Sequence, residues 1–398
     1  MKKFLALTLA LVMSLSLVAC GGQKADETPA DSTDQTEQPA DTTEEYKIAM
    51  ITDYGDITDQ SFNQTTYEAC KAFADANKIE FSYFKPAGDN TADRVAMIES
   101  AVDQGYNVIV MPGYAFGGAI VEAAPQHKDV KFIALDVGKG DLLEAGVAAK
   151  GEEYDYNPDN WDLATYVDMS NVYCAIYQEE LCGYMAGYAA VKLGYKNLGF
   201  LGGMAVPAVV RYGYGFVQGV DAAAADMGLT DVKVNYIYGG QFFGDADITA
   251  VMDTWYQGGT EVVFACGGGI YTSAVEAALK NNGYVIGVDV DQNYIGANGV
   301  ADGTYAYNPF ITSAMKGLSA AVETALTDIE GGEWSEIAAT NGNFGLEDGD
   351  YIGLPTDDDS WNFESFTKDE YEAVKAKIAS GQINVVNSSD DATKPTVR

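Results

Sequence analysis

Carboxylates, glycines and aromatic rings recur in this sequence at the ends of apolar runs that predict buried strands. Asp53, Asp136 and Asp289 each follow such a run, and the Gly267–Gly269 triplet follows another. A carboxylate accepts hydrogen bonds from two neighbouring hydroxyls, an aromatic face covers a planar ring, and glycines let backbone amides approach a ligand closely. This combination is typical of a site for a sugar attached to a flat base, and Phe62 would supply a ring at its rim.

The same residues also fit other roles. An Asp at the end of a strand often only forms a turn or caps a helix, and Phe62 would also serve as a packing residue. The Gly267–Gly269 triplet does not have the spacing of a phosphate-binding loop. Asp53, Asp56 and Asp59 could instead hold Ca²⁺ or activate a water molecule for hydrolysis. Their spacing does not match a regular calcium loop, so binding is favoured over catalysis.

The composition excludes several classes of protein. The chain has 59 acidic and 23 basic residues and a formal net charge of −36, so a nucleic acid polymer is excluded as a partner. The sequence contains one histidine, His127, which excludes a two-histidine zinc site and an HExxH helix. No motif in the sequence predicts a metal site or a cofactor.

The elements that must position these residues alternate between strands and helices. One series of apolar runs and amphipathic segments extends from 46 to 135, and a second from about 177 to 288. The alternation predicts an α/β fold with two doubly wound lobes joined by a multi-segment hinge. Residues 46–171 with 304–390 are expected to form the first lobe, and residues 172–303 the second. Ligands of such sheets lie beyond the carboxyl ends of the strands, so the site is expected in the cleft between the lobes.

Local patterns predict individual elements within this frame. The Ser61-x-x-Gln64 pattern predicts a capping box at the start of a helix. Further along, 304–310 is expected to be a strand and 311–328 a helix. A helix from 368 to about 378 is expected to cover the first lobe.

The cysteines carry little functional signal. Cys174 and Cys182 are expected in one helix, about 12 Å apart along its axis, too far for a disulfide. Cys70 is expected within a helix and Cys266 at the end of a strand. All four are therefore expected to be buried thiols, although a disulfide stays possible in an exported protein.

The N-terminal residues predict where the protein is located. Residues 1–19 have a basic start and an apolar stretch, and Leu17-Val18-Ala19-Cys20 resembles a bacterial lipobox. Cleavage before Cys20 and its acylation would attach the protein to the membrane by a lipid. An uncleaved anchor and a plain secretory signal are the alternatives. Residues 20–45 carry many acids and no large apolar residue, which predicts a disordered acidic tether after the lipidated cysteine.

The stretch from Ile51 to Gln64 resembles the opening signature of the basic membrane protein (BMP) lipoproteins. That family comprises substrate-binding components of ABC importers and includes the purine nucleoside receptor. Later blocks resemble the family in the same order: 182–190, 199–204, 213–216, 286–292 and 312–316. The resemblance covers 46 to about 383. One departure lies at 267–271, where Gly-Gly-Gly-Ile-Tyr replaces the family's usual Gly-Gly-Thr-Gly.

The resemblance implies a type I, periplasmic-binding-protein-like receptor that closes on a nucleoside. The residues that it assigns to ligand binding are Asp53, Phe62, Asn63, Asp136, Tyr212, Gly268, Asp289 and Lys316. Within this set Asp289 would hold the ribose, while Phe62 and Tyr212 would stack on the base. Tyr214 and Phe216 are the alternatives to Tyr212 as the second ring.

The function that follows is binding without catalysis. By resemblance the protein is expected to be a monomeric, lipid-anchored receptor on the outer side of a bacterial cell membrane, without a cofactor. It would close on a nucleoside, with purine nucleosides as the favoured ligands, and deliver it to an ABC permease. A sugar or autoinducer receptor and an extracytoplasmic sensor of the same fold are alternatives, and a nucleoside-acting enzyme is a further one.

Overall fold

The computed structural model describes residues 45–349 and 351–387 of the chain. These described residues form one compact unit. The predicted signal peptide at 1–19, the lipidated Cys20 and nearly all of the predicted tether at 20–45 lie outside the described residues. Among the described helices, none is long and apolar enough to span a bilayer.

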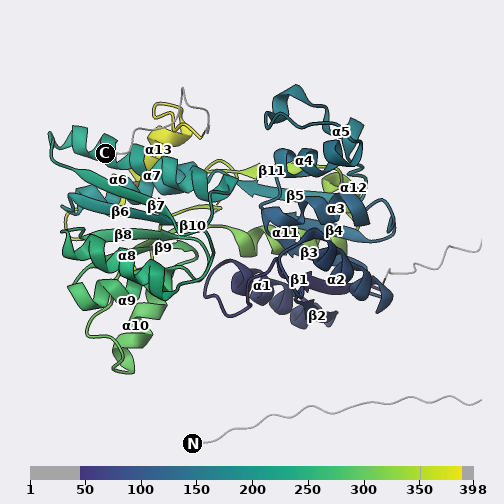
Figure 1. Ribbon diagram of the computed structural model, residues 1–398, viewed down its shortest axis with the longest axis horizontal. Helices are drawn as coiled ribbons and strands as arrows, with labels where there is room; N and C mark the ends of the chain where they lie inside the picture. The colour runs from purple at the N-terminus through teal and green to yellow at the C-terminus, as the bar shows by residue number, and fades with distance from the viewer. Residues whose placement is uncertain (1–44, 350, 388–398) are drawn as a thin grey trace, which may run out of the picture. The chain divides into compact units, whose positions relative to one another are not determined.

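The first of two six-stranded sheets is parallel throughout (Figure 1). Its strands are β1 (Lys47–Ile51), β2 (Glu80–Phe84), β3 (Val108–Pro112), β4 (Lys131–Leu135), β5 (Val172–Tyr177) and β11 (Asn341–Phe344), in the order β11-β5-β4-β3-β1-β2. The helices between them are α1 (Phe62–Asn77), α2 (Thr91–Asp103), η1 (Tyr114–Phe116), α3 (Gly117–Ala123), α4 (Lys139–Ala149), η2 (Pro158–Asn160) and α5 (Leu163–Tyr166). The strand order reverses between β3 and β1, so the turns after these strands open a crevice.

The second sheet repeats this arrangement and adds one antiparallel edge strand. Its strands are β6 (Asn197–Gly202), β7 (Lys233–Tyr238), β8 (Val262–Cys266), β9 (Tyr284–Asp289), β10 (Phe310–Lys316) and β12 (Ile352–Gly353), in the order β12-β10-β9-β8-β6-β7. The helices that follow its strands or pack on them are α6 (Glu179–Lys192), α7 (Pro207–Asp226), α8 (Ala246–Gln257), α9 (Tyr271–Asn281), α10 (Asn293–Ala301) and α13 (Lys368–Ala379). Here the order reverses between β8 and β6.

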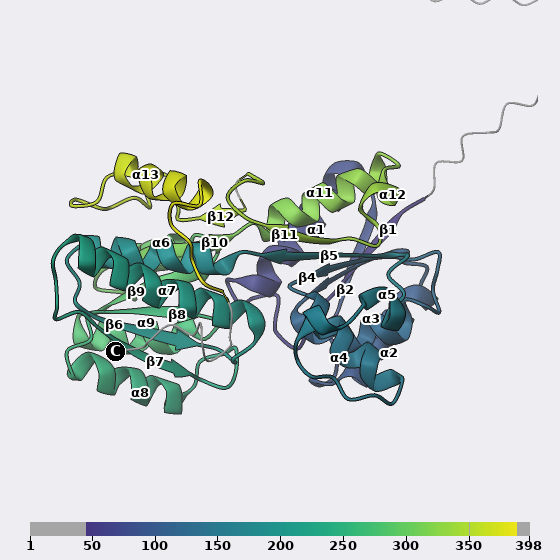
Figure 2. The same cartoon turned by 90° about the horizontal axis from the view of Figure 1, so that it is seen from above.

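The described chain crosses between the two sheets at three places. It passes from β5 to α6, from β10 to α11 (Leu318–Glu330), and from β11 to β12. Helix α11 packs against α1 of the first lobe, and the short α12 (Trp334–Ile337) follows it (Figure 2). The prediction of two doubly wound lobes joined by several segments is therefore confirmed.

The lobe boundaries differ from those expected from the sequence. Strand β5 was expected in the second lobe but pairs with β4, and β10 was expected in the first lobe but pairs with β9. The predicted helix over 311–328 is wrong at its start, because Phe310–Lys316 forms a mostly buried strand and the helix begins at Leu318. Helix α13 packs on α6 of the second lobe, not on the first lobe as expected (Figure 2).

The prediction that the four cysteines are buried is confirmed, whereas the prediction that Cys174 and Cys182 lie in one helix is wrong. Cys174 lies in β5 and Cys182 in α6, because the chain crosses between the sheets at 177–179. Cys70, Cys174, Cys182 and Cys266 are buried free thiols.

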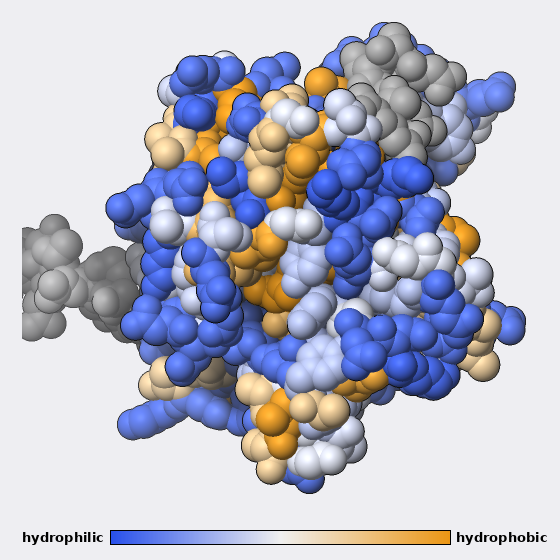
Figure 3. Space-filling model, turned by 90° about the vertical axis from the view of Figure 1, so that its left-hand side faces the viewer, coloured by the Kyte–Doolittle hydropathy of each residue, from blue (hydrophilic) through white to orange (hydrophobic). Residues whose placement is uncertain are grey.

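Apolar side chains fill both faces of each sheet. The largest buried cluster includes Met50 and Val110 of the first sheet with Phe200 and Phe264 of the second. Two further clusters cover the opposite faces of the two sheets. Each fully buried side chain of this size contributes roughly 1.5–3 kcal/mol. On the side of the second sheet that Figure 3 shows, hydrophilic residues cover most of the surface, with smaller hydrophobic patches between them.

Candidate ligand-binding site

A cavity of about 470 Å³ lies where the carboxyl ends of the two sheets meet. This volume is within the usual range for small-molecule sites. All eight residues assigned to ligand binding from the sequence line it: Asp53, Phe62, Asn63, Asp136, Tyr212, Gly268, Asp289 and Lys316. The structure thus brings together residues that follow β1, β4 and β8, the last residue of β9, and residues of α1, α7 and β10.

The turn after β1 fixes Asp53 at the wall of the cavity. Its Oδ1 accepts hydrogen bonds from the backbone N–H groups of Tyr54 and Gly55, both at 2.6 Å. Gly113 packs against the same side chain, where a Cβ would lie 3.2 Å from Asp53. With a φ of +123°, Gly113 also has a backbone conformation that favours glycine. Asp53 therefore holds the turn and lines the cavity at once.

The start of α1 is capped by Asp59 and not by the predicted capping box. The Asp59 carboxylate accepts hydrogen bonds from the backbone N–H groups of Ser61, Asn63 and Gln64 at 2.9–3.0 Å. Ser61 makes no side-chain cap, because its hydroxyl donates to Asp289 Oδ2 of the second lobe at 2.5 Å. The serine predicted to cap its own helix thus connects the two lobes.

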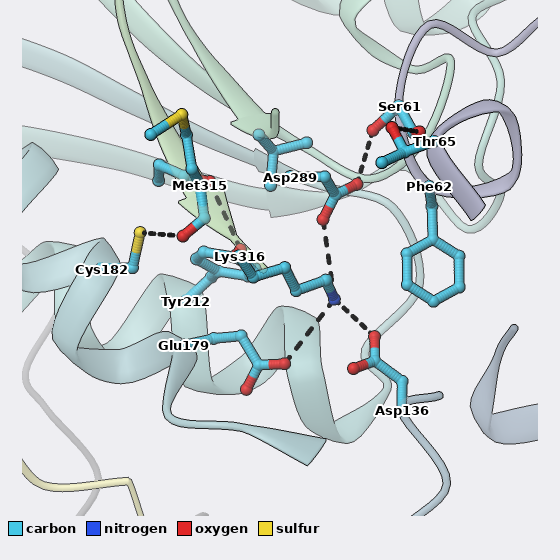
Figure 4. A network of polar contacts seen from close by, with 12 residues as sticks. Ser61, Phe62, Thr65, Asp136, Glu179, Cys182, Tyr212, Asp289, Met315 and Lys316 are labelled. Atoms are coloured by element: carbon cyan, nitrogen blue, oxygen red, sulfur yellow. Dashed lines mark hydrogen bonds and ion pairs between the residues drawn. The ribbon is translucent and has the colours of Figure 1, made fainter. Parts of the chain in front are cut away.

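Lys316, at the carboxyl end of β10, is surrounded by three carboxylates (Figure 4). Its Nζ lies 2.5 Å from Asp136 Oδ2, 3.6 Å from Asp289 Oδ1 and 3.7 Å from Glu179 Oε1. The Lys316 side chain is only 3% exposed. Asp136 comes from the first sheet and Asp289 from the second, so the ammonium group bridges both lobes.

The two predicted stacking rings both lie near this ammonium group. The Lys316 Nζ is 4.7 Å from the centroid of the Phe62 ring and 5.7 Å from that of Tyr212. Tyr212 is buried, and its hydroxyl donates to the carbonyl of Ala314 at 3.3 Å. Phe62 is only half-buried. Phe62 therefore offers more ring surface to a ligand, while Tyr212 forms part of the cavity wall.

A further ring, Phe242, reaches the cavity from the turn after β7. Its centroid lies 6.2 Å from that of Tyr54, which lines the cavity from the first lobe. The glycine triplet holds it in place: Gly269 N–H donates to the Phe242 carbonyl at 2.9 Å. A Cβ on Gly267 would lie 2.8 Å from the Phe242 ring. The triplet therefore seats an aromatic residue against the cavity.

Burial sets the acid–base properties of the site. Burial raises the pKa of Asp53 above its ordinary value and that of Asp59 to about 6. It also raises the pKa of Asp136 to about 6, although the charge of Lys316 opposes this. For Lys316, burial by itself lowers the pKa, but the surrounding carboxylates outweigh it and raise that pKa above its ordinary value. Lys316 is therefore a fixed positive charge.

The backbone and the side chains that line this cavity have two unusual features. Asp136 and Asp289 have positive φ values of 58° and 67°, which are uncommon for residues other than glycine and often occur at functional sites. Tyr54 Oη, Asn63 Oδ1 and Asp136 Oδ1 are buried without a hydrogen-bond partner. Because buried polar atoms are nearly always paired, these atoms are suited to a ligand's hydroxyl and amino groups.

The comparison with known proteins identifies the family. Residues 46–388 match the model of the Bmp family, described as ABC transporter substrate-binding protein PnrA-like. The chain belongs to the Bmp family. The assignment confirms the resemblance in the stretch from Ile51 to Gln64. Members of the Bmp family are substrate-binding proteins of ABC transporters, which act outside the cytoplasm and are not enzymes.

Individual relatives are distant. The chain is 26% identical over 354 residues to the ABC transporter nucleoside-binding protein BmpA of Lactococcus lactis subsp. cremoris, covering 86% of this chain and 89% of the relative. It is 27% identical over 399 residues to a CD4+ T-cell-stimulating antigen of Listeria innocua, covering 96% and 98%. Its fold is similar to that of an ABC transporter solute-binding protein from Aeropyrum pernix K1, with a TM-score of 0.67, 20% identity and coverage of 87% and 95%.

Several residues that shape the site of this Bmp-family protein were missed from the sequence. Phe242 comes shortly after a strand and two glycines, so the search for functional residues just after predicted strands could have found it. Tyr54 and Tyr114 lie directly after β1 and β3, where the same rule applies. Glu179 gave no such signal, because it begins a helix and reaches Lys316 only through the fold.

Proposed function

We propose that this Bmp-family protein binds a purine nucleoside and delivers it to the permease of an ABC importer. The observation that carries the proposal is the position of two carboxylates, Asp136 of the first lobe and Asp289 of the second, whose side chains are 9% and 6% exposed. Both line a cavity that also contains aromatic rings. Carboxylates suit the ribose hydroxyls and rings suit the base. The printed name of the Lactococcus lactis relative, a nucleoside-binding protein, supports the same ligand class.

Each side chain then has a role in holding the ligand. Asp289 accepts the ribose hydroxyls, and Asp136 with Asn63 accepts further donors through oxygens that have no protein partner. The base lies against Phe62, with Phe242 as the ring of the second lobe. Stacking of a base on an aromatic side chain contributes about 1–3 kcal/mol. Because these groups come from both lobes, a bound ligand favours the arrangement in which the lobes are together.

Calorimetric titration tests the ligand class. The protein is unfolded and refolded to remove any ligand that it carries from the cells. It is then titrated with adenosine, guanosine, inosine, uridine, ribose and galactose. Micromolar or tighter binding of a purine nucleoside, with weaker binding of uridine, is expected. Heat from a free sugar but from no nucleoside would contradict the proposal and favour a sugar receptor. Release of free base from inosine would instead indicate an enzyme.

We also propose that the predicted lipobox anchors the receptor beside its permease. Acylation of Cys20 would keep the protein at the membrane after removal of the preceding segment. Cells that produce the Cys20→Ser variant are expected to release the protein into the medium or periplasm and to take up radiolabelled nucleoside more slowly. Retention of that variant in the membrane fraction would contradict the anchor.

A further inference from the structure

Glu179 is a buried charge that the proposed binding roles leave unused. It does not line the cavity, and its side chain is 0% exposed. Glu179 Oε2 accepts a hydrogen bond from Arg211 Nε at 2.6 Å. Its other oxygen, Oε1, has no hydrogen-bond partner and lies 3.7 Å from Lys316 Nζ. A buried charge is costly unless it is paired, so this arrangement needs an explanation.

The fold holds this carboxylate in place from two sides. Glu179 is the first residue of α6, where the helix dipole favours a negative charge. Arg211 comes from α7, which approaches α6 very closely: a Cβ on Gly215 would lie 1.9 Å from the carbonyl of Glu180. The closeness of the two helices lets Arg211 reach Glu179. The Glu179–Arg211 pair is therefore a rigid feature of the second lobe, beside the crossing from β5.

The distances around Lys316 show what this pair does. The Lys316 Nζ is nearly equidistant from Glu179 and Asp289, at 3.7 and 3.6 Å, and makes a hydrogen bond only to Asp136 among the three carboxylates. At 3.6 Å the Asp289 Oδ1 atom is beyond normal hydrogen-bond distance from the ammonium group. Glu179 and Asp289 thus attract the ammonium group from nearly equal distances. Neutralising Glu179 removes one of these two attractions and leaves that of Asp289.

We propose that Glu179, held by Arg211, is a positioning residue that keeps the Lys316 ammonium away from Asp289 and so leaves Asp289 free to accept ligand hydroxyls. The inference rests on the proposed function, because it assigns the hydroxyls to a ribose. It predicts that neutralising Glu179 weakens the binding of a nucleoside with ribose hydroxyls. The binding of an analogue without these hydroxyls is expected to change little.

The test compares two ligands and two neighbouring variants. Inosine and 2′,3′-dideoxyinosine differ in the ribose hydroxyls, and their Kd values are measured by calorimetric titration. Glu179→Gln is expected to raise the Kd for inosine about tenfold, within the usual range for coupled neighbours, and to change that for the dideoxy compound less than about twofold. The discrimination between the two ligands therefore falls.

Glu180→Gln is the matched control. Glu180 is the next residue of α6 and is also buried, but its Oε1 accepts a hydrogen bond from Asn387 Nδ2 and it does not line the cavity. The control makes the same Glu-to-Gln change in the same helical turn. It is expected to leave both Kd values within about twofold of the original protein.

Each result decides between the alternatives. Equal weakening of both ligands by Glu179→Gln, or no change in either, would overturn the inference. Failure of the original protein to bind any nucleoside would instead overturn the proposed function. Thermal unfolding without ligand checks that each variant folds. If Glu179→Gln does not fold, Arg211→Lys replaces it, since it keeps the charge but loses the Nε donor; discrimination is expected to fall there too, and unchanged discrimination would overturn the inference.

Discussion

Asp289 is held by the protein through only one of its two carboxylate oxygens. Its Oδ2 accepts the Ser61 hydroxyl, while its Oδ1 faces Lys316 at 3.6 Å without a hydrogen bond. Asp289 is 5% exposed, so water can hardly replace a hydrogen bond that its carboxylate lacks. Under the proposed function, specificity for hydroxyl-bearing ligands follows from this burial, because a ligand without hydroxyls leaves Oδ1 without a hydrogen bond.

The first prediction concerns Asp289→Asn. Asparagine tolerates the φ of +67° at this position and keeps the size of the side chain, so the change removes mainly the charge. Inosine is expected to bind at least about 10-fold more weakly, whereas the free base hypoxanthine changes less than about threefold. Titration of both ligands measures this, with the exposed Asp302→Asn as the control. Equal losses for nucleoside and base would contradict the ribose role.

The second prediction concerns phosphorylated ligands. Among the described residues that line the cavity, the two lysines are both paired with carboxylates, Lys85 with Asp56 at 2.9 Å and Lys316 with Asp136 at 2.5 Å. A phosphate would meet no unpaired cation and several negative charges. Inosine 5′-monophosphate is therefore expected to bind at least about 100-fold more weakly than inosine. Asp56→Asn removes the partner of Lys85 and should reduce the difference in affinity between the two ligands. Equal binding of both ligands by the original protein would refute the prediction.

At the scale of elements, the contact between α6 and α7 determines where the charged residues meet. Glycines on both helices permit it: a Cβ on Gly183 would lie 2.1 Å from the carbonyl of Tyr212, and one on Gly219 would lie 1.9 Å from that of Tyr184. No side chain fits at such distances from backbone atoms. The crossing segment that carries Glu179 and the helix that carries Arg211 are therefore held at a fixed separation.

The third prediction is the cost of filling this contact. Gly215→Ala places a methyl group against the Glu180 carbonyl, so the helices must separate, and the free energy of unfolding is expected to fall by at least about 1–3 kcal/mol. Gly140→Ala in α4 is the control, because its Cβ would meet only the Tyr154 hydroxyl at 3.6 Å. Alanine favours helix there by up to about 1 kcal/mol. Urea unfolding measures both, and a neutral effect of Gly215→Ala would contradict the close contact.

At the scale of the whole molecule, burial of acids accompanies a large excess of negative charge. The formal net charge is −36. Buried carboxyls with raised pKa values are Asp53, Asp59, Asp136, Asp141 and Glu180. Burial raises the pKa of Asp141 to about 6 and that of Glu180 to about 7. These groups bind protons more readily in the folded state than in the unfolded state, where carboxyls titrate near pH 4.

The fourth prediction is therefore a decrease in stability as pH rises. Between about pH 5 and pH 7 these five groups hold more protons in the folded state than in the unfolded state, so the free energy of unfolding falls with increasing pH. A decrease on the order of 1–3 kcal/mol between pH 5 and pH 7.5 is expected from urea unfolding. Glu180→Gln removes one such group and should make the dependence shallower. Stability that rises over this interval would contradict the prediction.

The sequence by itself determined the alternation of strands and helices, the family and eight of the residues that line the cavity. Asp53, Asp136, Gly268 and Asp289 could be found from local features, because apolar runs mark strands and the residues at their carboxyl ends lie at one edge of a sheet. Asn63, Tyr212 and Lys316 came from the resemblance to the family.

Only the tertiary structure decided the contacts among those residues. Ser61 was predicted to cap its own helix but donates to Asp289, 228 positions away. The segment 311–316 was predicted to be helical but forms β10, because pairing with β9 and burial override its local preference. Glu179 reaches Lys316 because α6 packs against β10, a strand far along the chain from it. Local periodicity does not predict such contacts, since they depend on which distant segments are buried together.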